Sequence, residues 1–215
     1  MCNYTRQSQT IKSANDWFKT ALPDDFNEAD WYQSNFINGF SHPNIPILHD
    51  RHPGQIITNY TWGLLPHGRS EDFRKNTLNA RVETLEDKPS FTNYLNNRCC
   101  IITDGYYDWH WNDEKGKSKT KYQVNSQEAE IFCLAGIYNS FTDPAGKVWN
   151  TYSIATTSPD PTMKWVHNRK AMEGDERMPI MLRTGDEQAW MDVKNHPLDF
   201  AYPNYQPSLV AFPAD

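Results

Sequence analysis

The chain has 215 residues, of which 38% are hydrophobic and 22% are charged, enough apolar sequence for one buried core. Its formal net charge of -6 excludes attraction to nucleic acid by overall charge, so a DNA site would need a local basic patch. No stretch approaches the roughly 18 apolar residues of a membrane span, and the polar start is unlike a signal peptide, which predicts a cytoplasmic protein without a membrane partner.

The pattern along the chain predicts more strands than helices. An early helix is expected to end within residues 15–22, and short helices are expected over residues 70–75, 90–96 and 184–193. Apolar and β-branched runs predict strands over residues 43–48, 55–62, 99–103, 106–111, 121–125, 131–138 and 149–157. Turn signals at residues 104–105, 112–118 and 143–146 separate the later strands and favour antiparallel pairing.

These elements predict an α+β fold. We expect a single domain over residues 1–215, with a mainly antiparallel β-sheet or barrel-like core and short peripheral helices, because neither a repeat nor a linker interrupts the chain. The tail from His196 onward, rich in proline and aromatic residues, is expected to follow an irregular path over this domain.

The cysteines contain no Cys-x-x-Cys pair. Cys99, Cys100 and Cys133 lie in apolar runs typical of buried strands. The sequence therefore predicts neither a disulfide framework nor a structural zinc site, and the scattered histidines give no sign of another metal site or of a cofactor.

Cys2 follows the initiator methionine, and removal of Met1 would leave Cys2 with a free α-amine. Such an amine has an ordinary pKa of about 7.7–8.0 and can attack an aldehyde near neutral pH. The neighbouring thiol can then add to the imine and close a five-membered thiazolidine ring. The alternative is that Cys2 is a small apolar residue at the start of a first strand.

Three further residue types suit chemistry at an aldehyde. Strand alternation in 106–111 points Tyr106 and Asp108 to one face and the intervening residues to the other. Asp108 and His167 can give and take protons near neutral pH, and the Asn79 amide can orient an amine or a carbonyl. Each also has a structural alternative: a turn at Asn79, an ion pair at Asp108 and a helix cap at His167.

Two stretches carry enough basic residues for a local DNA contact. Mixed surface charge is the alternative for each of them. The basic residues are Arg69, Arg74, Lys75 and Arg81 in the first stretch, and Lys164, Arg169, Lys170, Arg177 and Arg183 in the second.

Several motifs occur in one order along the chain. They are Cys2, Trp62-Gly63 with Pro66, Asn79-Ala80-Arg81 through Thr84, Lys88-Pro89-Ser90-Phe91, Arg98-Cys99 with Asp104-Gly105-Tyr106-Tyr107-Asp108-Trp109, Ala135-Gly136, Thr156-Thr157, and His167-Asn168 followed by Arg177-Met178-Pro179. Together they resemble the SOS-response-associated peptidase (SRAP) family of abasic-site processing proteins over residues 2–182.

The resemblance implies a monomeric sensor that crosslinks itself to abasic sites in single-stranded DNA, with a nucleoid location if the source is bacterial. In this reading Cys2 is the nucleophile, Asn79 orients its amine or the sugar, and Asp108 and His167 assist ring opening and proton transfer. DNA contacts are expected at Arg69, Arg81, Arg169 and Arg177.

The chain departs from the family pattern at identifiable places. Asn3 and Tyr4 follow Cys2 where many members have glycine and arginine, and Asp108 stands where glutamate is usual. His67 replaces a tryptophan often found there, and residues 170–176 lengthen the connection after His167.

Other function classes use the same residues. The family name implies a hydrolase, a peptidase in which Cys2 cleaves peptides or its own leading methionine, and lyase activity at the lesion is a further enzyme class. The remaining alternative is a noncatalytic module that binds single-stranded DNA without forming a covalent product.

Overall fold

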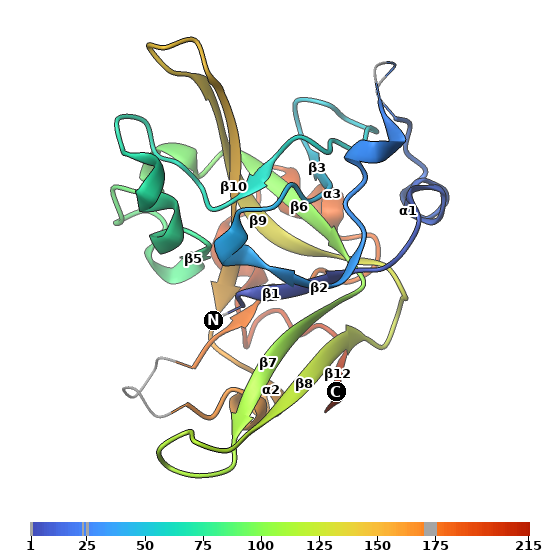
Figure 1. The fold of residues 1–215 in the computed structure, drawn as a ribbon, viewed down its shortest axis with the longest axis vertical. Coiled ribbons are helices and arrows are strands. Elements are labelled where there is room, and N and C mark those ends of the chain that lie inside the picture. Colours follow the sequence, from blue (N-terminus) through green and yellow to red (C-terminus); the bar gives the residue numbers. More distant parts are fainter. Residues whose placement is uncertain (1, 23, 25, 170–175) are drawn as a thin grey trace.

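Two β-sheets make up most of the fold, which a computed structural model describes for residues 2–22, 24, 26–169 and 176–215 (Figure 1). The five-stranded sheet has the order β12 (Leu209–Pro213), β8 (Lys119–Ser126), β7 (Gly105–Trp111), β1 (Tyr4–Gln7) and β2 (Ser34–Asn38). The second sheet has the order β11 (Met178–Pro179), β10 (Val148–Thr157), β9 (Phe132–Thr142), β6 (Arg98–Thr103) and β3 (Ile47–His49). The short strands β4 (Thr61–Trp62) and β5 (Asn79–Arg81) pair in parallel with β10.

The α+β class and the mainly antiparallel pairing are confirmed, but over the described residues the sheets stay open and do not close into a barrel. The long β9–β10 hairpin shows how local sequence directs this pairing. Its turn is held by the Asp143 carboxylate, which accepts the backbone N–H groups of Ala145 and Lys147 at 2.9 Å each. Gly146 supplies the positive φ of 83° that the turn requires.

The helices are short and lie around the sheets. The α-helices are α1 (Ile11–Phe18), α2 (Pro161–Val166) and α3 (Glu187–Met191), and the 3-10 helices are η1 (Glu28–Asp30), η2 (Gly39–Ser41), η3 (Glu71–Asn76), η4 (Val82–Thr84), η5 (Thr92–Tyr94) and η6 (Pro197–Phe200). The early helix ends within the predicted range of residues 15–22, because Lys19 terminates it in the left-handed conformation, and Thr10 caps its start by accepting the Ser13 N–H. No helix of the described residues is long and apolar enough to cross a membrane.

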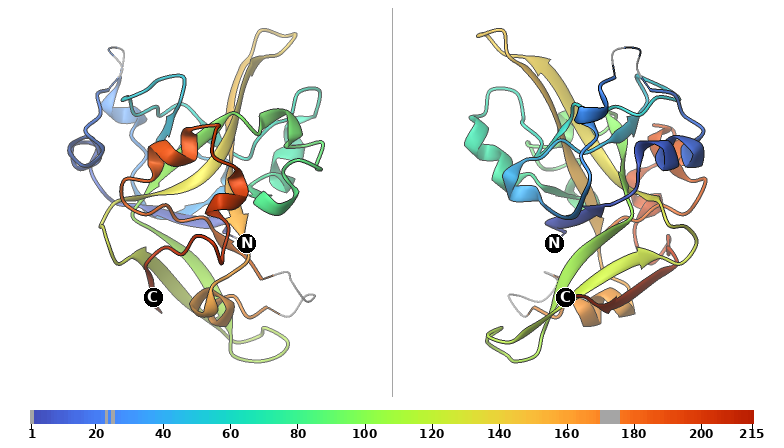
Figure 2. Two further views of the ribbon diagram at one scale, coloured as in Figure 1. Left: turned by 180° about the vertical axis from the view of Figure 1, so that it is seen from behind. Right: turned by 45° about the vertical axis from the view of Figure 1, so that its right-hand side comes forward.

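The buried side chains form two groups, one on each side of the larger sheet. On one side α3 packs against β6 and β9 (Figure 2), and the Trp190 indole N–H donates to the Cys99 carbonyl at 2.9 Å. The other group lies toward the five-stranded sheet and includes Cys2, Trp62 and Tyr106, each at most 1% exposed. The predicted burial of Cys99, Cys100 and Cys133 in strands is confirmed.

The predicted strands over residues 99–103, 106–111, 121–125, 131–138 and 149–157 are all present. The strands predicted at 43–48 and 55–62 shrink to β3 and β4, and the helices predicted at 90–96 and 184–193 shrink to η5 and α3. The helix predicted at 70–75 is present as the 3-10 helix η3, shifted by one residue. The irregular path predicted for the tail is wrong in part, because residues 209–213 form the regular edge strand β12 beside β8. Strands β1, β2, β5 and β11 and helix α2 were not predicted.

Candidate functional site

The site begins where β1 stops pairing with β7. The antiparallel ladder joins Arg6 to Gly105 and ends with Tyr4 opposite Tyr107, so Asp108 is the first β7 residue beyond it. Cys2 lies just before β1, only 1% exposed, and its Sγ is 3.9 Å from the Tyr4 carbonyl oxygen. The end of this ladder therefore brings the segment at Cys2 to the part of β7 that carries Asp108.

Asp108 and His167 form a close pair. His167 Nδ1 lies 2.8 Å and 2.7 Å from the two Asp108 carboxylate oxygens. Asp108 Oδ1 also accepts the Trp109 backbone N–H at 2.8 Å, which fixes the carboxylate on its strand. His167 directly follows α2, and its backbone N–H donates to the Met163 carbonyl at 2.7 Å. Helix α2 packs on β7, and this packing brings the His167 imidazole next to the Asp108 carboxylate, although the two residues are 59 positions apart in the sequence.

Asn79 reaches the same region from the other sheet. It lies on β5, opposite Ile154 of β10, and its Nδ2 donates to Asn3 Oδ1 at 3.0 Å. Asn3 is held in turn by β2 and its continuation, since the Gly39 N–H donates to the Asn3 carbonyl at 2.9 Å. The Asn79 amide thus contacts Asn3, the residue next to Cys2.

Buried polar atoms without a hydrogen-bond partner gather here, among the residues that the structure describes. They include Asn79 Oδ1 and the hydroxyls of Tyr106 and Tyr152. Burial raises the pKa of both tyrosines well above the ordinary value of 10.0, so both hydroxyls stay protonated and can donate. Buried groups of this kind are normally satisfied by water or a ligand, so the region offers acceptors and donors to a bound molecule.

The environment of Cys2 keeps its thiol neutral. Burial, and then the nearby Asp108 carboxylate, raise the pKa of Cys2 from 9.0 to about 12. This direction is opposite to that of cysteines activated as thiolates, whose pKa is lowered by cationic or helix-terminal surroundings.

The predicted DNA-contacting arginines fall into two groups. Arg69, Arg81 and Arg169 are exposed, Arg81 at the end of β5 and Arg169 two residues beyond His167. The Arg69 guanidinium lies 5.1 Å from the Phe73 ring centroid, and that of Arg169 lies 5.8 Å from the Trp111 centroid. Lys170 and most of the 170–176 connection, like Met1, lie outside the described residues.

Arg177 does not agree with the prediction of a DNA contact. It is 5% exposed, and its guanidinium makes a two-pronged ion pair with Glu83 and donates to the Thr156 carbonyl at 2.8 Å. Arg74 of the first basic stretch is similarly buried, donating to the Gly63 carbonyl at 2.9 Å. Both side chains are buried, and their hydrogen bonds join η4, β10 and the loops around β4.

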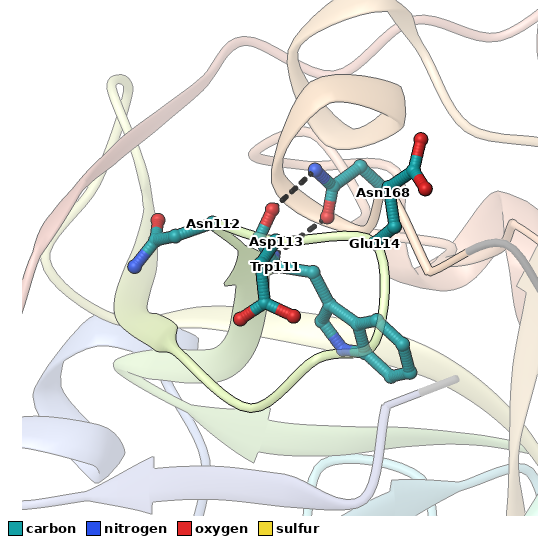
Figure 3. A pocket seen from close by; sticks show the side chains of 5 residues that line it. All are labelled: Trp111, Asn112, Asp113, Glu114 and Asn168. Atoms are coloured by element: carbon teal, nitrogen blue, oxygen red, sulfur yellow. Dashed lines mark hydrogen bonds between the residues drawn. The ribbon is translucent and has the colours of Figure 1, made fainter.

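Asn168 is a positioning residue that the sequence reading did not single out. Its carboxamide closes on the backbone of Trp111, accepting the Trp111 N–H at 2.7 Å and donating to the Trp111 carbonyl at 3.0 Å. Figure 3 shows this contact beside a pocket of about 240 Å³ lined by Trp111, Asn112, Asp113, Glu114 and Asn168. The only sequence signal was its place next to His167.

The described residues contain no group of three histidine, cysteine, aspartate or glutamate side chains placed to hold a metal ion.

Comparison with known families matches residues 1–209 to the family described as SOS response associated peptidase (SRAP). Abasic site processing protein YoqW of Bacillus subtilis is 34% identical over 148 residues, which are 68% of this chain and 62% of that protein. YoaM of the same organism, also named an abasic site processing protein, is 32% identical over 156 residues, 72% of this chain and 63% of that protein. The match thus spans less than two thirds of the length of these relatives.

Solved structures with the same fold cover the whole chain. A Bacteroides thetaiotaomicron protein superposes with a TM-score of 0.83 at 26% identity, over 100% of this chain and 92% of its own. A Bordetella bronchiseptica protein gives a TM-score of 0.74 at 18% identity, covering 100% of both chains, which supports the fold alone.

Proposed function

The chain belongs to the SOS response associated peptidase (SRAP) family, and from that premise we propose that it recognises abasic sites in single-stranded DNA and bonds covalently to them through Cys2. The observation that carries the proposal is the placement of Cys2 beside the Asp108–His167 pair and the Asn79–Asn3 contact. We further propose that the protein acts as a monomer and a single domain inside the cell, at the nucleoid if its source is bacterial.

The proposed reaction begins once Met1 is removed. The Cys2 α-amine attacks C1′ of the ring-opened deoxyribose aldehyde, and loss of water gives an imine. The thiol sulfur then adds to the imine carbon while the thiol proton passes to the nitrogen, which closes a thiazolidine. The Asp108–His167 pair would move the protons for sugar opening and water loss, and Asn79 would orient the amine or the sugar.

The protonation state of the thiol supports this order of steps. With a pKa of about 12, Cys2 presents a neutral thiol at neutral pH, so the amine is the better first nucleophile. A peptidase that depends on a thiolate would need the opposite shift.

Hydrolysis remains a second candidate because the Asp108–His167 pair is also the arrangement that orients a general base. In that case the protein would cleave a peptide, such as its own leading methionine. The imine is also the species from which strand cleavage by β-elimination would start, so lyase activity would accompany slow ring closure.

A denaturing gel tests the proposal. Methionine-processed protein incubated with single-stranded DNA containing one abasic site should give an adduct that survives denaturation, and the intact mass should equal protein plus DNA less one water. Cys2→Ala and Cys2→Ser both keep an α-amine once methionine is removed but lack the trapping thiol, so neither should give an adduct that survives denaturation. An equally stable adduct from Cys2→Ala would contradict the mechanism.

A further inference from the structure

The Tyr106 hydroxyl is a buried donor that makes no hydrogen bond within the part of the chain that the structure describes. Tyr106 lies on β7, and the residue is 0% exposed. A hydroxyl that is buried without a partner gives up its hydrogen bonds to water and gains none in return, which destabilises the folded state. The hydroxyl therefore lacks a use in the fold itself and is available to a molecule that brings an acceptor.

Strand pairing places Tyr106 on the same side of β7 as the candidate site. Tyr106 and Asp108 share one face of the strand, about 7 Å apart along it, because successive side chains alternate. Across the ladder Tyr106 is opposite Thr5 of β1, three residues after Cys2 (Figure 1). Cys2 and Tyr106 belong to the same group of buried side chains. Because Cys2 is itself only 1% exposed, an aldehyde that bonds to its amine has to enter this buried region.

The other polar groups of the site are acceptors or are already bonded. The Asp108 carboxylate only accepts hydrogen bonds, and its two oxygens lie 2.8 Å and 2.7 Å from His167 Nδ1. Asn79 donates from its Nδ2 to Asn3, which leaves its Oδ1 as an acceptor without a partner among the described residues. Asn79 Oδ1 thus suits an amine N–H, whereas an oxygen of the substrate needs a donor such as Tyr106.

Tyr152 carries a second buried hydroxyl without a partner in the described residues, but it belongs to the larger sheet. It lies on β10, opposite Tyr138 of β9, and its ring is nearly parallel to that of Trp62 at a centroid distance of 6.4 Å. Of the two tyrosines, Tyr106 is the one on the strand that carries Asp108.

We propose that Tyr106 is a further catalytic residue of adduct formation, whose hydroxyl donates a hydrogen bond to the oxygen on C1′ while that oxygen leaves as water. This inference rests on the proposed function, in which the Cys2 amine adds to the C1′ aldehyde and gives a carbinolamine. The C1′–O bond then breaks, and the oxygen takes a proton from the Asp108–His167 pair. The nitrogen forms the C=N bond and returns a proton to that pair.

Tyr106 keeps its own proton throughout this step. Burial raises its pKa well above the ordinary value of 10.0, so the phenol is a fixed donor and not an acid. A donor held at a reacting oxygen, away from bulk water, stabilises the charge that develops there as the bond breaks.

Tyr106→Phe tests the inference because it removes the hydroxyl and keeps the ring. Adduct formation with single-stranded DNA containing one abasic site should slow about 10²- to 10³-fold, the loss typical of removing one donor from a reacting oxygen. The melting temperature should stay the same or rise, because the hydroxyl has no partner in the described fold to lose. Single-turnover kinetics on denaturing gels and thermal unfolding measure the two effects.

Tyr60→Phe is the matched control. Tyr60 is a similarly buried tyrosine, 5% exposed, whose ring lies 5.2 Å from His49 and 5.6 Å from Tyr138. This variant should form the adduct at the wild-type rate.

A second measurement locates the step on which Tyr106 acts. Cys2→Ser keeps the amine but lacks the thiol, so its imine persists until sodium cyanoborohydride reduces it to a secondary amine that survives denaturation. Adding Tyr106→Phe to Cys2→Ser should slow the appearance of this reduced product by about the same factor as it slows adduct formation.

The outcomes separate this inference from the proposed function. Adduct formation by Tyr106→Phe at the rate of Tyr60→Phe would overturn the inference even if the wild-type adduct forms. An unchanged rate of imine reduction in the double variant would also overturn it, and a melting temperature lowered by several degrees would assign the hydroxyl to the fold. Absence of both the adduct and the reduced imine from the wild-type protein would overturn the proposed function and, with it, this role of Tyr106.

Discussion

At the scale of single residues, the burial of Cys2 determines how it reacts. Its raised pKa means that the folded state favours the neutral thiol. The stabilisation from this preference is present below the ordinary value of 9.0 and is lost as the pH rises from there through about 12, because the unfolded chain ionises first.

The same shift predicts slow alkylation. The rate at which iodoacetamide modifies Cys2 in the folded protein should keep rising with pH beyond 9, by about tenfold per unit, because only the thiolate reacts. Mass spectrometry of the Cys2 peptide measures it, with the denatured chain as the control. A plateau below pH 9 in the folded protein would contradict the assigned environment.

Asp108 acts on two neighbours, so its removal should have two effects. Asp108→Asn should slow adduct formation about 10²- to 10⁴-fold through loss of proton transfer. It should also speed Cys2 alkylation, since the carboxylate is one cause of the raised Cys2 pKa. The rate of adduct formation, followed on denaturing gels, measures the first effect, and Asp87→Asn, a substitution of an exposed aspartate, is the control. A normal rate of adduct formation in Asp108→Asn would remove the carboxylate from the mechanism.

At the scale of elements, the contact of Asn168 with Trp111 fixes the end of α2 to β7. Asn168→Ala should lower the free energy of unfolding by about 1–3 kcal/mol, because two hydrogen bonds to backbone are lost. It should also slow adduct formation by letting His167 move away from Asp108.

Thermal unfolding and single-turnover adduct kinetics measure both effects, with exposed Asn93→Ala as the control. If the folded Asn168→Ala variant forms the adduct at the wild-type rate and with the wild-type pH profile, Asn168 only stabilises the fold and does not position His167.

Sequence reasoning succeeded for the long central strands and failed for the short ones. β6, β7, β9 and β10 carry continuous apolar or alternating patterns that need no partner to be recognised. β5 and β11 are three and two residues long and are extended only because β10 lies beside them, so their own residues carry no periodic signal. Helix α2 was missed although Asp160 and Pro161 are a typical capping pair.

The residue types of the candidate site were accessible from sequence, but their contacts were not. The facing direction of Asp108 followed from alternation in β7, as the structure confirms. Burial of Arg177 did not follow, because its partner Glu83 lies 94 residues away and pairing over that distance depends on the tertiary fold.

At the scale of the whole molecule, the last strand supports the sheet that carries the site. β12 covers the outer edge of β8, from Leu209 opposite Ser126 to Pro213 opposite Tyr122. Without β12 that edge would present unpaired backbone groups to solvent.

Truncation after Ser208 should therefore lower the melting temperature by about 2–8 °C, the shift expected for 1–2 kcal/mol in a chain of this size, and should promote aggregation. Truncation after Pro213, which keeps β12, is the control. Circular dichroism melts and light scattering compare the two, and equal melting temperatures would argue that β12 does not support the sheet.

The position of β1 between β2 and β7 sets an order of events during synthesis. The first strand made has its inner partner more than ninety residues later, and the histidine that faces Asp108 follows later still. The reactive segment at Cys2 is therefore assembled only after most of the polypeptide has left the ribosome. Nascent chains would carry the thiol before the carboxylate and imidazole of the candidate site are in place beside it.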